Sequence, residues 1–180
     1  KRENMKMFKY LKSLSLFFLL SLSVCVGQVY AQEDIVEVDY IEVNFDDEKK
    51  LAEQGDAEAQ FNMGAWYAEG EVVEQDIKQS VYWYKKSADQ GFVLAQYNLG
   101  LCYYNGEGVK QDYKQAASLW KKAADQGYAA AQFNLGICYI SGQGVKKDIK
   151  KALILYKKAA EQEFVNAQFN LGYLYLDGKL

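Results

Sequence analysis

The stretch DAEAQFNMGAWYAEGEVVEQDIKQSVYWYKKSADQG (56–91) decides the fold, because its pattern returns every 36 residues without an insertion or a deletion. The residues that keep this spacing are Gly64, Gly100, Gly136 and Gly172; Ala59, Ala95, Ala131 and Ala167; and Tyr67, Tyr103, Tyr139 and Tyr175. A fixed period of about 20 to 50 residues marks an array of similar units, each burying its apolar face against its neighbours. Such arrays usually serve as binding surfaces, so the sequence favours a binding protein over an enzyme.

Each period predicts two helices joined by turns that contain glycine. Residues 57–68 have apolar side chains at helical spacing, and Gly70 follows them at the position that commonly ends a helix. Asp76 is suited to cap a second helix, which runs from residue 77 to about residue 90. The same cap returns at Asp112 and Asp148. We therefore expect an all-α fold, an α-solenoid of antiparallel helix hairpins with a 36-residue repeat.

The period also divides the chain into segments. These are a secretory signal peptide (1–31), an acidic linker (32–45), a leading half-repeat helix (46–56), three full repeats (57–92, 93–128 and 129–164) and a partial fourth repeat (165–180). The leading helix has the pattern of the second helix of a hairpin, and Asp46 or Asp47 is expected to cap it. Because the chain opens at Lys1 and stops within a repeat, we expect either a fragment or a true start at Met5.

Gly64 and its equivalents lie inside the first helix of each repeat. A glycine there costs about 1 kcal/mol relative to alanine. We expect a close approach of the paired helix to offset this cost.

Residues 1–31 have the order of a secretory signal peptide. Lysines precede an apolar run over residues 14–26, and Val29-Tyr30-Ala31 supplies small side chains before a cut ahead of Gln32. The run has 13 residues, whereas a membrane-spanning helix needs about 20. We therefore expect export, with a periplasmic or secreted location. An uncleaved membrane anchor and a lipoprotein cut before Cys25 are the alternatives.

The charge balance argues against a nucleic-acid partner. The chain carries 21 basic and 24 acidic residues, and removal of residues 1–31 leaves 16 cations, all lysine, against 23 anions. An acidic surface without arginine repels phosphate backbones and offers no bidentate forks to them.

The composition excludes the catalytic sites that depend on histidine. There is no histidine, which excludes Ser-His-Asp and Cys-His nucleophile systems and histidine metal sites. Carboxylate pairs could still hydrolyse a glycoside, but the acids fall at repeated helix caps and solvent faces.

Cys102 and Cys138 lie on stacked helices about 8–10 Å apart, too far for a disulfide. We expect two buried thiols, with a disulfide as the alternative because exported chains favour them.

The stretch AQFNLGICYISGQGV (131–145), followed by Lys146-Lys147-Asp148 and the Tyr-Lys-Lys-Ala-Ala run at 156–160, resembles the Sel-one-like repeat (SLR) family, a branch of the tetratricopeptide superfamily. The resemblance covers residues 46–180. It implies a right-handed superhelix whose first-type helices line a concave groove, and roles as adaptors in bacterial envelopes and host contact. Some secreted bacterial relatives are cysteine-rich and linked to penicillin binding, but this chain lacks their paired cysteines.

Two residues depart from the repeat pattern. Val72 stands where later loops have Gly108 and Gly144, and Glu163 stands where earlier helices end at a glycine. These departures put the local turns in question, not the fold.

Carried onto this chain, the family geometry defines a candidate groove. The predicted peptide-binding residues are Asn62, Asn98, Asn134, Asn170, Leu94, Leu101, Tyr104, Ile137, Ile140 and Tyr173. Each asparagine would grip a peptide main chain with two donors and one acceptor; alternatively, the asparagines bond loop backbone groups within each repeat. A neighbouring aromatic position either joins the groove or packs between helices; its residues are Phe61, Tyr97, Phe133 and Phe169.

We therefore expect a non-enzymatic exported scaffold that binds a protein or peptide in its concave groove. A cell-envelope hydrolase or β-lactam-acting protein is one alternative, and a regulatory subunit of a membrane complex is another. We expect no cofactor, no metal, no nucleic acid, no membrane span after signal cleavage, and a monomer.

Overall fold

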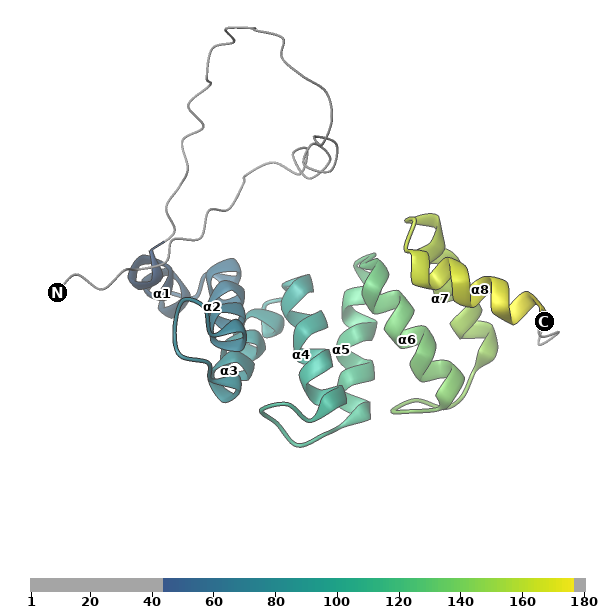
Figure 1. The fold of residues 1–180 in the computed structure, drawn as a ribbon, viewed down its shortest axis with the longest axis horizontal. Helices are drawn as coiled ribbons and strands as arrows, with labels where there is room; N and C mark the ends of the chain where they lie inside the picture. The colour runs from purple at the N-terminus through teal and green to yellow at the C-terminus, as the bar shows by residue number, and fades with distance from the viewer. Residues whose placement is uncertain (1–43, 177–180) are drawn as a thin grey trace, which may run out of the picture. The chain divides into compact units, whose positions relative to one another are not determined.

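The computed structural model describes residues 44–176, and within this range the chain forms helices and no strands (Figure 1). The helices are α1 (Phe45–Glu53), α2 (Ala57–Glu69), α3 (Ile77–Asp89), α4 (Val93–Asn105), α5 (Tyr113–Asp125), α6 (Ala129–Ser141), α7 (Ile149–Glu161) and α8 (Val165–Leu176). The predicted signal peptide and residues 32–43 of the linker lie outside the described residues. The expected all-α fold is confirmed.

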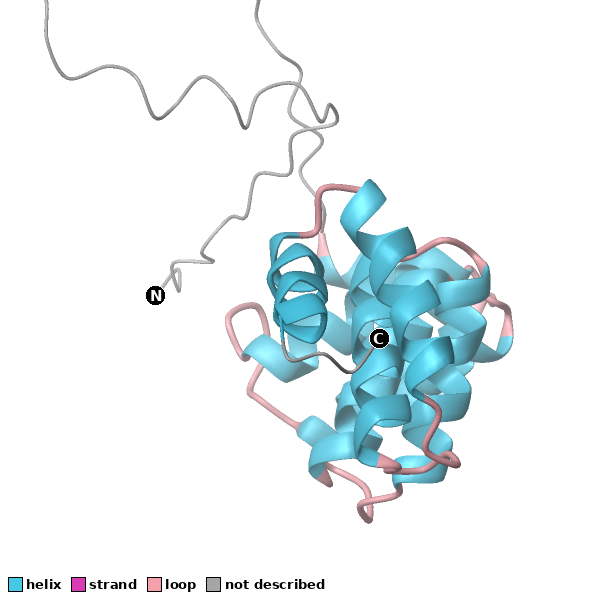
Figure 2. Cartoon of the chain, turned by 90° about the vertical axis from the view of Figure 1, so that its right-hand side faces the viewer, coloured by secondary structure: helices cyan, strands magenta, loops and turns pink. Residues whose placement is uncertain are grey.

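The helices pack in chain order. The closest pairs are the hairpins α2–α3, α4–α5 and α6–α7, and successive hairpins meet through α3–α4, α5–α6 and α7–α8. Turning the array by 90° shows the same helices joined by short loops (Figure 2). We call α2, α4, α6 and α8 the A-type helices and α1, α3, α5 and α7 the B-type helices. This is the arrangement of an α-solenoid, in which each unit contacts mainly its neighbours.

The caps predicted from the sequence are present. The Asp76 and Asp112 carboxylates each accept hydrogen bonds from two backbone N–H groups in the first turns of α3 and α5, and the Asp148 carboxylate accepts one at α7. Gly70 ends α2 in the left-handed conformation at φ +73°, and Gly106 ends α4 at φ +78°. These caps satisfy backbone groups at the starts of α3, α5 and α7 and so help to fix where these helices begin.

The predicted cap of the leading helix is wrong. α1 begins at Phe45, so Asp46 and Asp47 lie inside its first turn and do not precede it. There the two carboxylates face the positive end of the helix dipole, which suits acidic residues as well as a cap position does.

The helical glycines are sites of close helix contact, as expected. A Cβ atom at Gly64 would lie 2.5 Å from the Tyr84 ring, and one at Gly136 would lie 2.5 Å from the Tyr156 ring. Both rings belong to the B-type helix of the same hairpin. Gly172 differs, because a Cβ there would meet no neighbouring atom within 4 Å.

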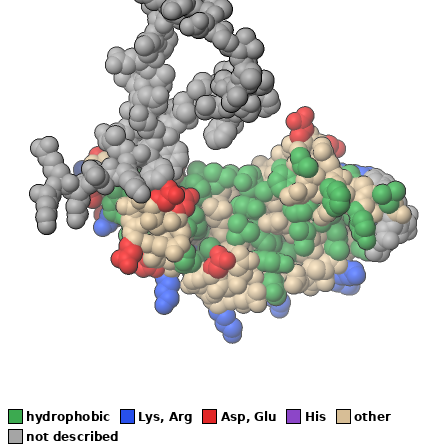
Figure 3. All heavy atoms as spheres, in the orientation of Figure 1, with side chains coloured by type: hydrophobic (Ala, Val, Ile, Leu, Met, Phe, Trp, Pro, Cys, Tyr) green, Lys and Arg blue, Asp and Glu red, His purple; other side chains and the backbone are tan. Residues whose placement is uncertain are grey.

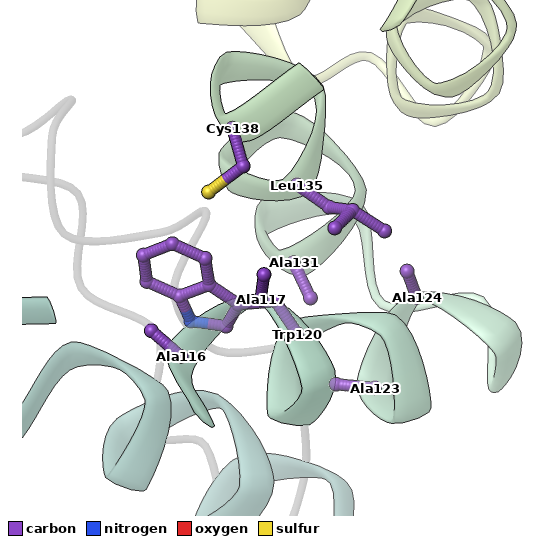
Figure 4. Close-up of a cluster of buried hydrophobic side chains, with 8 residues drawn as sticks. All are labelled: Ala116, Ala117, Trp120, Ala123, Ala124, Ala131, Leu135 and Cys138. Atoms are coloured by element: carbon purple, nitrogen blue, oxygen red, sulfur yellow. The ribbon is translucent and has the colours of Figure 1, made fainter. Parts of the chain in front are cut away.

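The core between repeats combines small and large side chains. In the cluster between α5 and α6, Trp120 lies among alanines of α5 and faces Ala131, Leu135 and Cys138 of α6 (Figure 4). Alanine lets the two helices approach, and the indole fills the remaining space. Full burial of a large apolar side chain stabilises a fold by about 1.5–3 kcal/mol, so burial of Trp120 contributes to holding these two repeats together.

The two departures from the pattern have different outcomes. Glu163 adopts φ +62°, the left-handed conformation that Gly127 adopts at φ +91° in the preceding repeat. The turn is therefore kept, at a cost of about 1–2 kcal/mol for a residue with a Cβ. Gly108 has φ +68° and packs against the Ile77 carbonyl, whereas Val72 closes the first loop without a positive φ.

Candidate functional site

The predicted groove residues lie on the A-type helices and are only partly buried. Leu94, Leu101 and Tyr104 belong to α4, and Ile137 and Ile140 belong to α6. Tyr173 of α8 has an exposed fraction of 58 %. Hydrophobic side chains gather in a broad patch over the central and C-terminal helices on the face shown in Figure 3. The peptide-binding role of these residues stays a prediction.

Most of these apolar residues also hold neighbouring repeats together. Leu101 packs against the cluster shared by α5 and α6. Ile137 and Ile140 pack against Leu153 and Leu174, which belong to α7 and α8. Each side chain therefore has one part in the core and another part at the surface, so a substitution there changes both.

Tyr104 connects two repeats. Its hydroxyl donates a hydrogen bond to the Gln143 side-chain oxygen in the next loop, at 3.0 Å. Its ring lies edge-on to Tyr113 and tilted against Trp120, with centroid distances of 5.1 and 5.2 Å. Burial raises the pKa of the Tyr104 hydroxyl. Tyr104 therefore helps to hold two successive repeats together, independently of any ligand.

Two of the four asparagines, Asn62 and Asn170, have side-chain partners that neither sequence interpretation included. Asn62 donates to the Glu48 carboxylate at 2.6 Å, and Asn170 donates to the Tyr156 hydroxyl at 3.4 Å. In both cases the partner lies fourteen residues earlier, on the preceding B-type helix. Each bond occupies part of one amide and leaves its other hydrogen-bonding capacity for a ligand.

The neighbouring aromatic position packs between repeats. Phe61 lies 5.7 Å from the ring of Tyr84 and 5.3 Å from that of Phe92. Tyr97 contacts Tyr128 edge-on at 5.1 Å. Phe133 makes equivalent contacts with Tyr156 and Phe164. The core-packing interpretation is thus confirmed for these three rings, and Phe169 alone among the four is largely exposed, at 74 %.

A network that joins three buried glutamines to three exposed ones was not predicted. On the A-type helices, Gln60, Gln96 and Gln132 donate to carbonyl oxygens of the preceding B-type helices, those of Ala52, Ala88 and Ala124. Their own side-chain oxygens accept hydrogen bonds from Gln90, Gln126 and Gln162 at 2.8–3.0 Å. The signal was visible in the sequence, because these glutamines recur every 36 residues. We call these six residues the glutamine network.

Cys102 and Cys138, the cysteines of the described residues, are buried and unpaired. Burial raises the pKa of each thiol to about 11. A thiol with so high a pKa is protonated and a poor nucleophile at neutral pH. The predicted buried thiols are therefore confirmed.

Residues 44–176 contain no group of three acidic, cysteine or histidine side chains that could hold a metal ion. Within the same range, none of the helices has both the length and the apolar character needed to span a bilayer.

Hairpins of constant length, glycine-mediated contacts and a repeated glutamine network together define the class of α-solenoid repeat proteins. A family model described as Sel1 repeat matches residues 57–92, 93–128, 129–164 and 165–180. The chain belongs to the Sel1 repeat family. Proteins of this family are generally non-catalytic scaffolds for protein interactions.

Solved structures agree with this assignment. The chain is similar to c5321, described as a protective antigen of uropathogenic Escherichia coli with an SLR fold, at 42 % identity and a TM-score of 0.73 over 76 % of this chain. It covers only 29 % of that longer protein. A Sel1 repeat protein from Oxalobacter formigenes is 36 % identical, with a TM-score of 0.66 over 70 % of this chain and 95 % of the relative.

Cysteine-rich protein B of Helicobacter pylori shares the fold at 24 % identity and a TM-score of 0.55, over 72 % of this chain and 98 % of that one. Among curated proteins, none matches the chain.

Proposed function

We propose that the A-type helices form a concave surface that binds an apolar or mixed peptide segment of another protein. The observation that carries this proposal is the position shared by Leu101, Ile137 and Tyr173. These side chains lie one period apart on three successive A-type helices, and each is partly exposed. A peptide lying across α4, α6 and α8 would meet one such side chain on each of these helices, in the manner of other solenoid proteins.

The test compares two pairs of substitutions. Leu101→Gln with Ile137→Gln makes the proposed surface polar, whereas Tyr82→Gln with Ile154→Gln makes the same kind of change at exposed positions of the B-type helices. In a pull-down from envelope extract, we expect the first pair to lower partner capture about tenfold and the second to leave it unchanged. If both proteins fold and capture the same partners equally, the surface has been misassigned.

We also propose that the protein is exported, on the strength of the basic and apolar pattern of residues 6–31. Mass spectrometry of the natural protein should find Gln32 at its mature N-terminus. A lipidated Cys25 would support the anchor alternative, and an uncleaved protein retained in the cytoplasm would refute export.

Absence of catalysis is likewise a proposal for this chain. It rests on the use of Asp76, Asp112 and Asp148 as helix caps, because an acid–base enzyme needs an unrepeated group of perturbed residues. Turnover of a β-lactam or a peptidoglycan fragment by the purified protein would overturn it.

A further inference from the structure

Charge is unevenly distributed along the array. Residues 44–92 carry eleven acidic residues and five lysines, whereas residues 93–164 carry six acidic residues and ten lysines. The C-terminal half is therefore positive within a chain whose net charge is −3. A local excess of one sign on a protein of the other sign attracts partners of complementary charge.

Six of these lysines lie together at one edge of the array. We call this set the lysine edge; it consists of Lys110, Lys114, Lys146, Lys147, Lys150 and Lys151, all exposed. They occupy the loops before α5 and α7 and the first turns of those helices. The two loop regions are in contact, because Gly144 packs directly on the Tyr113 carbonyl.

A shallow hollow lies between these loop regions. Its volume is about 500 Å³. It is lined by Gln111, Asp112, Tyr113, Lys114, Gly142, Gly144, Val145 and Lys146. Lysines from two successive repeats thus border one concave surface, which is large enough to receive a few side chains of an extended chain.

The fold does not explain this concentration of lysines. Cations near a helix N-terminus oppose the helix dipole and lower stability. Lys151 lies 3.6 Å from the Asp148 carboxylate, but the other five form no ion pair with any residue in 44–176. The Asp112 carboxylate is already engaged by the backbone N–H groups of α5. Five ammonium groups that form no ion pair within the described residues, at positions where cations lower stability, fit an external partner.

We propose that the lysine edge binds an acidic segment of a partner protein, at a site separate from the surface on the A-type helices. Lysine ammonium groups are point charges on flexible stems and can reach carboxylates spaced along an extended chain. A membrane surface fits less well, because membrane-bound faces usually add inserted apolar side chains to their positive charge. The large exposed hydrophobic residues of the described chain all lie elsewhere: Leu51, Tyr82, Ile154, Val165, Phe169, Tyr173 and Leu176.

The experiment measures binding of a fluorescently labelled oligo-glutamate peptide by anisotropy at low salt. Lys114→Gln with Lys146→Gln and Lys147→Gln should weaken binding about tenfold, because each exposed pair contributes modestly. The matched control, Lys122→Gln with Lys157→Gln and Lys158→Gln, removes the same charge from the same two repeats at exposed sites away from the loops. Its affinity should stay within about twofold of that of the unaltered protein.

Further measurements separate the outcomes. The lysine-edge variant should unfold at the same or a slightly higher temperature, because it removes cations from helix N-termini. Equal weakening in both triple variants, or equal binding of oligo-glutamine, would overturn the proposal by showing non-specific attraction. Lysine-dependent binding to phosphatidylglycerol vesicles without binding to oligo-glutamate would overturn it in favour of a membrane. The Leu101→Gln and Ile137→Gln protein should still bind oligo-glutamate, so this proposal and the proposed function can fail separately.

Discussion

The third repeat and the terminal helix α8 carry similar A-type sequences in different surroundings. In the third repeat, Gly136 is covered by the Tyr156 ring and Gln132 is buried. In α8, the equivalent Gly172 and Gln168 are exposed, because no B-type helix follows within the described residues. Ala167 stays fully buried in α8 on the side that α7 covers.

The difference shows that one sequence pattern contains two sets of contacts. One set faces the preceding B-type helix and is complete in α8. The other set faces the following B-type helix and is complete only in α2, α4 and α6. The consequences of a substitution should therefore depend on the repeat in which it is made, even at equivalent positions.

Substitutions of the equivalent glycines Gly136 and Gly172 should differ most in their effect on the free energy of unfolding. Gly136→Ala forces a methyl group against the fully buried Tyr156 ring and should lower the free energy of unfolding by about 3 kcal/mol. Gly172→Ala adds a methyl group in open space and should raise it by about 1 kcal/mol through helix propensity. Chemical denaturation of the two variants checks this. Effects of the same sign would break the comparison.

Substitutions of the equivalent glutamines Gln132 and Gln168 should differ less in their effect on the free energy of unfolding. Gln132→Ala leaves the Ala124 carbonyl without its buried donor and removes the acceptor of the Gln162 amide, which should cost about 2 kcal/mol. Gln168→Ala removes an exposed hydrogen bond to the Ala160 carbonyl and should cost less than about 0.5 kcal/mol. Urea midpoints measure both effects. A cost at Gln168 as large as that at Gln132 would mean that α8 is covered by a partner.

A substitution at the junction between the third repeat and α8 should make the protein more stable. Glu163→Gly removes the penalty of a side chain at φ +62° and should raise the free energy of unfolding by about 1 kcal/mol. Gly127→Ala, at the equivalent turn one repeat earlier, should lower it by a similar amount. Thermal denaturation of both variants provides the measurement, and a destabilised Glu163→Gly variant would show that the glutamate has a stabilising contact of its own.

The exposed face of α8 should give the smallest effect. Phe169→Gln replaces a ring that is 74 % exposed, so the free energy of unfolding should change by less than about 0.5 kcal/mol. A loss greater than about 1 kcal/mol that depends on protein concentration would show that a second copy covers this face.

The fold was predictable because the same helix pattern recurs in every 36-residue repeat. The sequence signals were local. Asp76 indicates a helix start, Gly70 indicates a helix end, and Gly64 indicates a close contact between helices. The start of α1 was less certain, since an acidic residue suits both a cap and a first turn. Glu163 could not be predicted from residue preference alone. The repeat holds this turn in the left-handed conformation, although a glutamate disfavours it.

The contacts of the candidate site were harder to predict. The partners of Asn62 and Asn170 lie on another helix and could not be read from residues within one hairpin. The glutamine network recurs with the period, but the sequence does not show which groups bond: some partners lie eight positions earlier on the preceding hairpin, and others lie thirty positions later within the same hairpin. The exposure of Leu101 and Ile137 depends on how tightly successive hairpins stack, which the order of residue types alone does not determine.

The glutamine network has a mechanical consequence. Its bonds link each repeat only to itself and to the repeat before it, so a force applied at the two ends of the array loads the junctions in series. Junctions built from the same bonds should yield at similar forces, one after another. Each rupture would release one 36-residue unit, or about 120 Å of extended chain. Under tension, this array would behave as a chain of nearly equal links that lengthens in uniform steps.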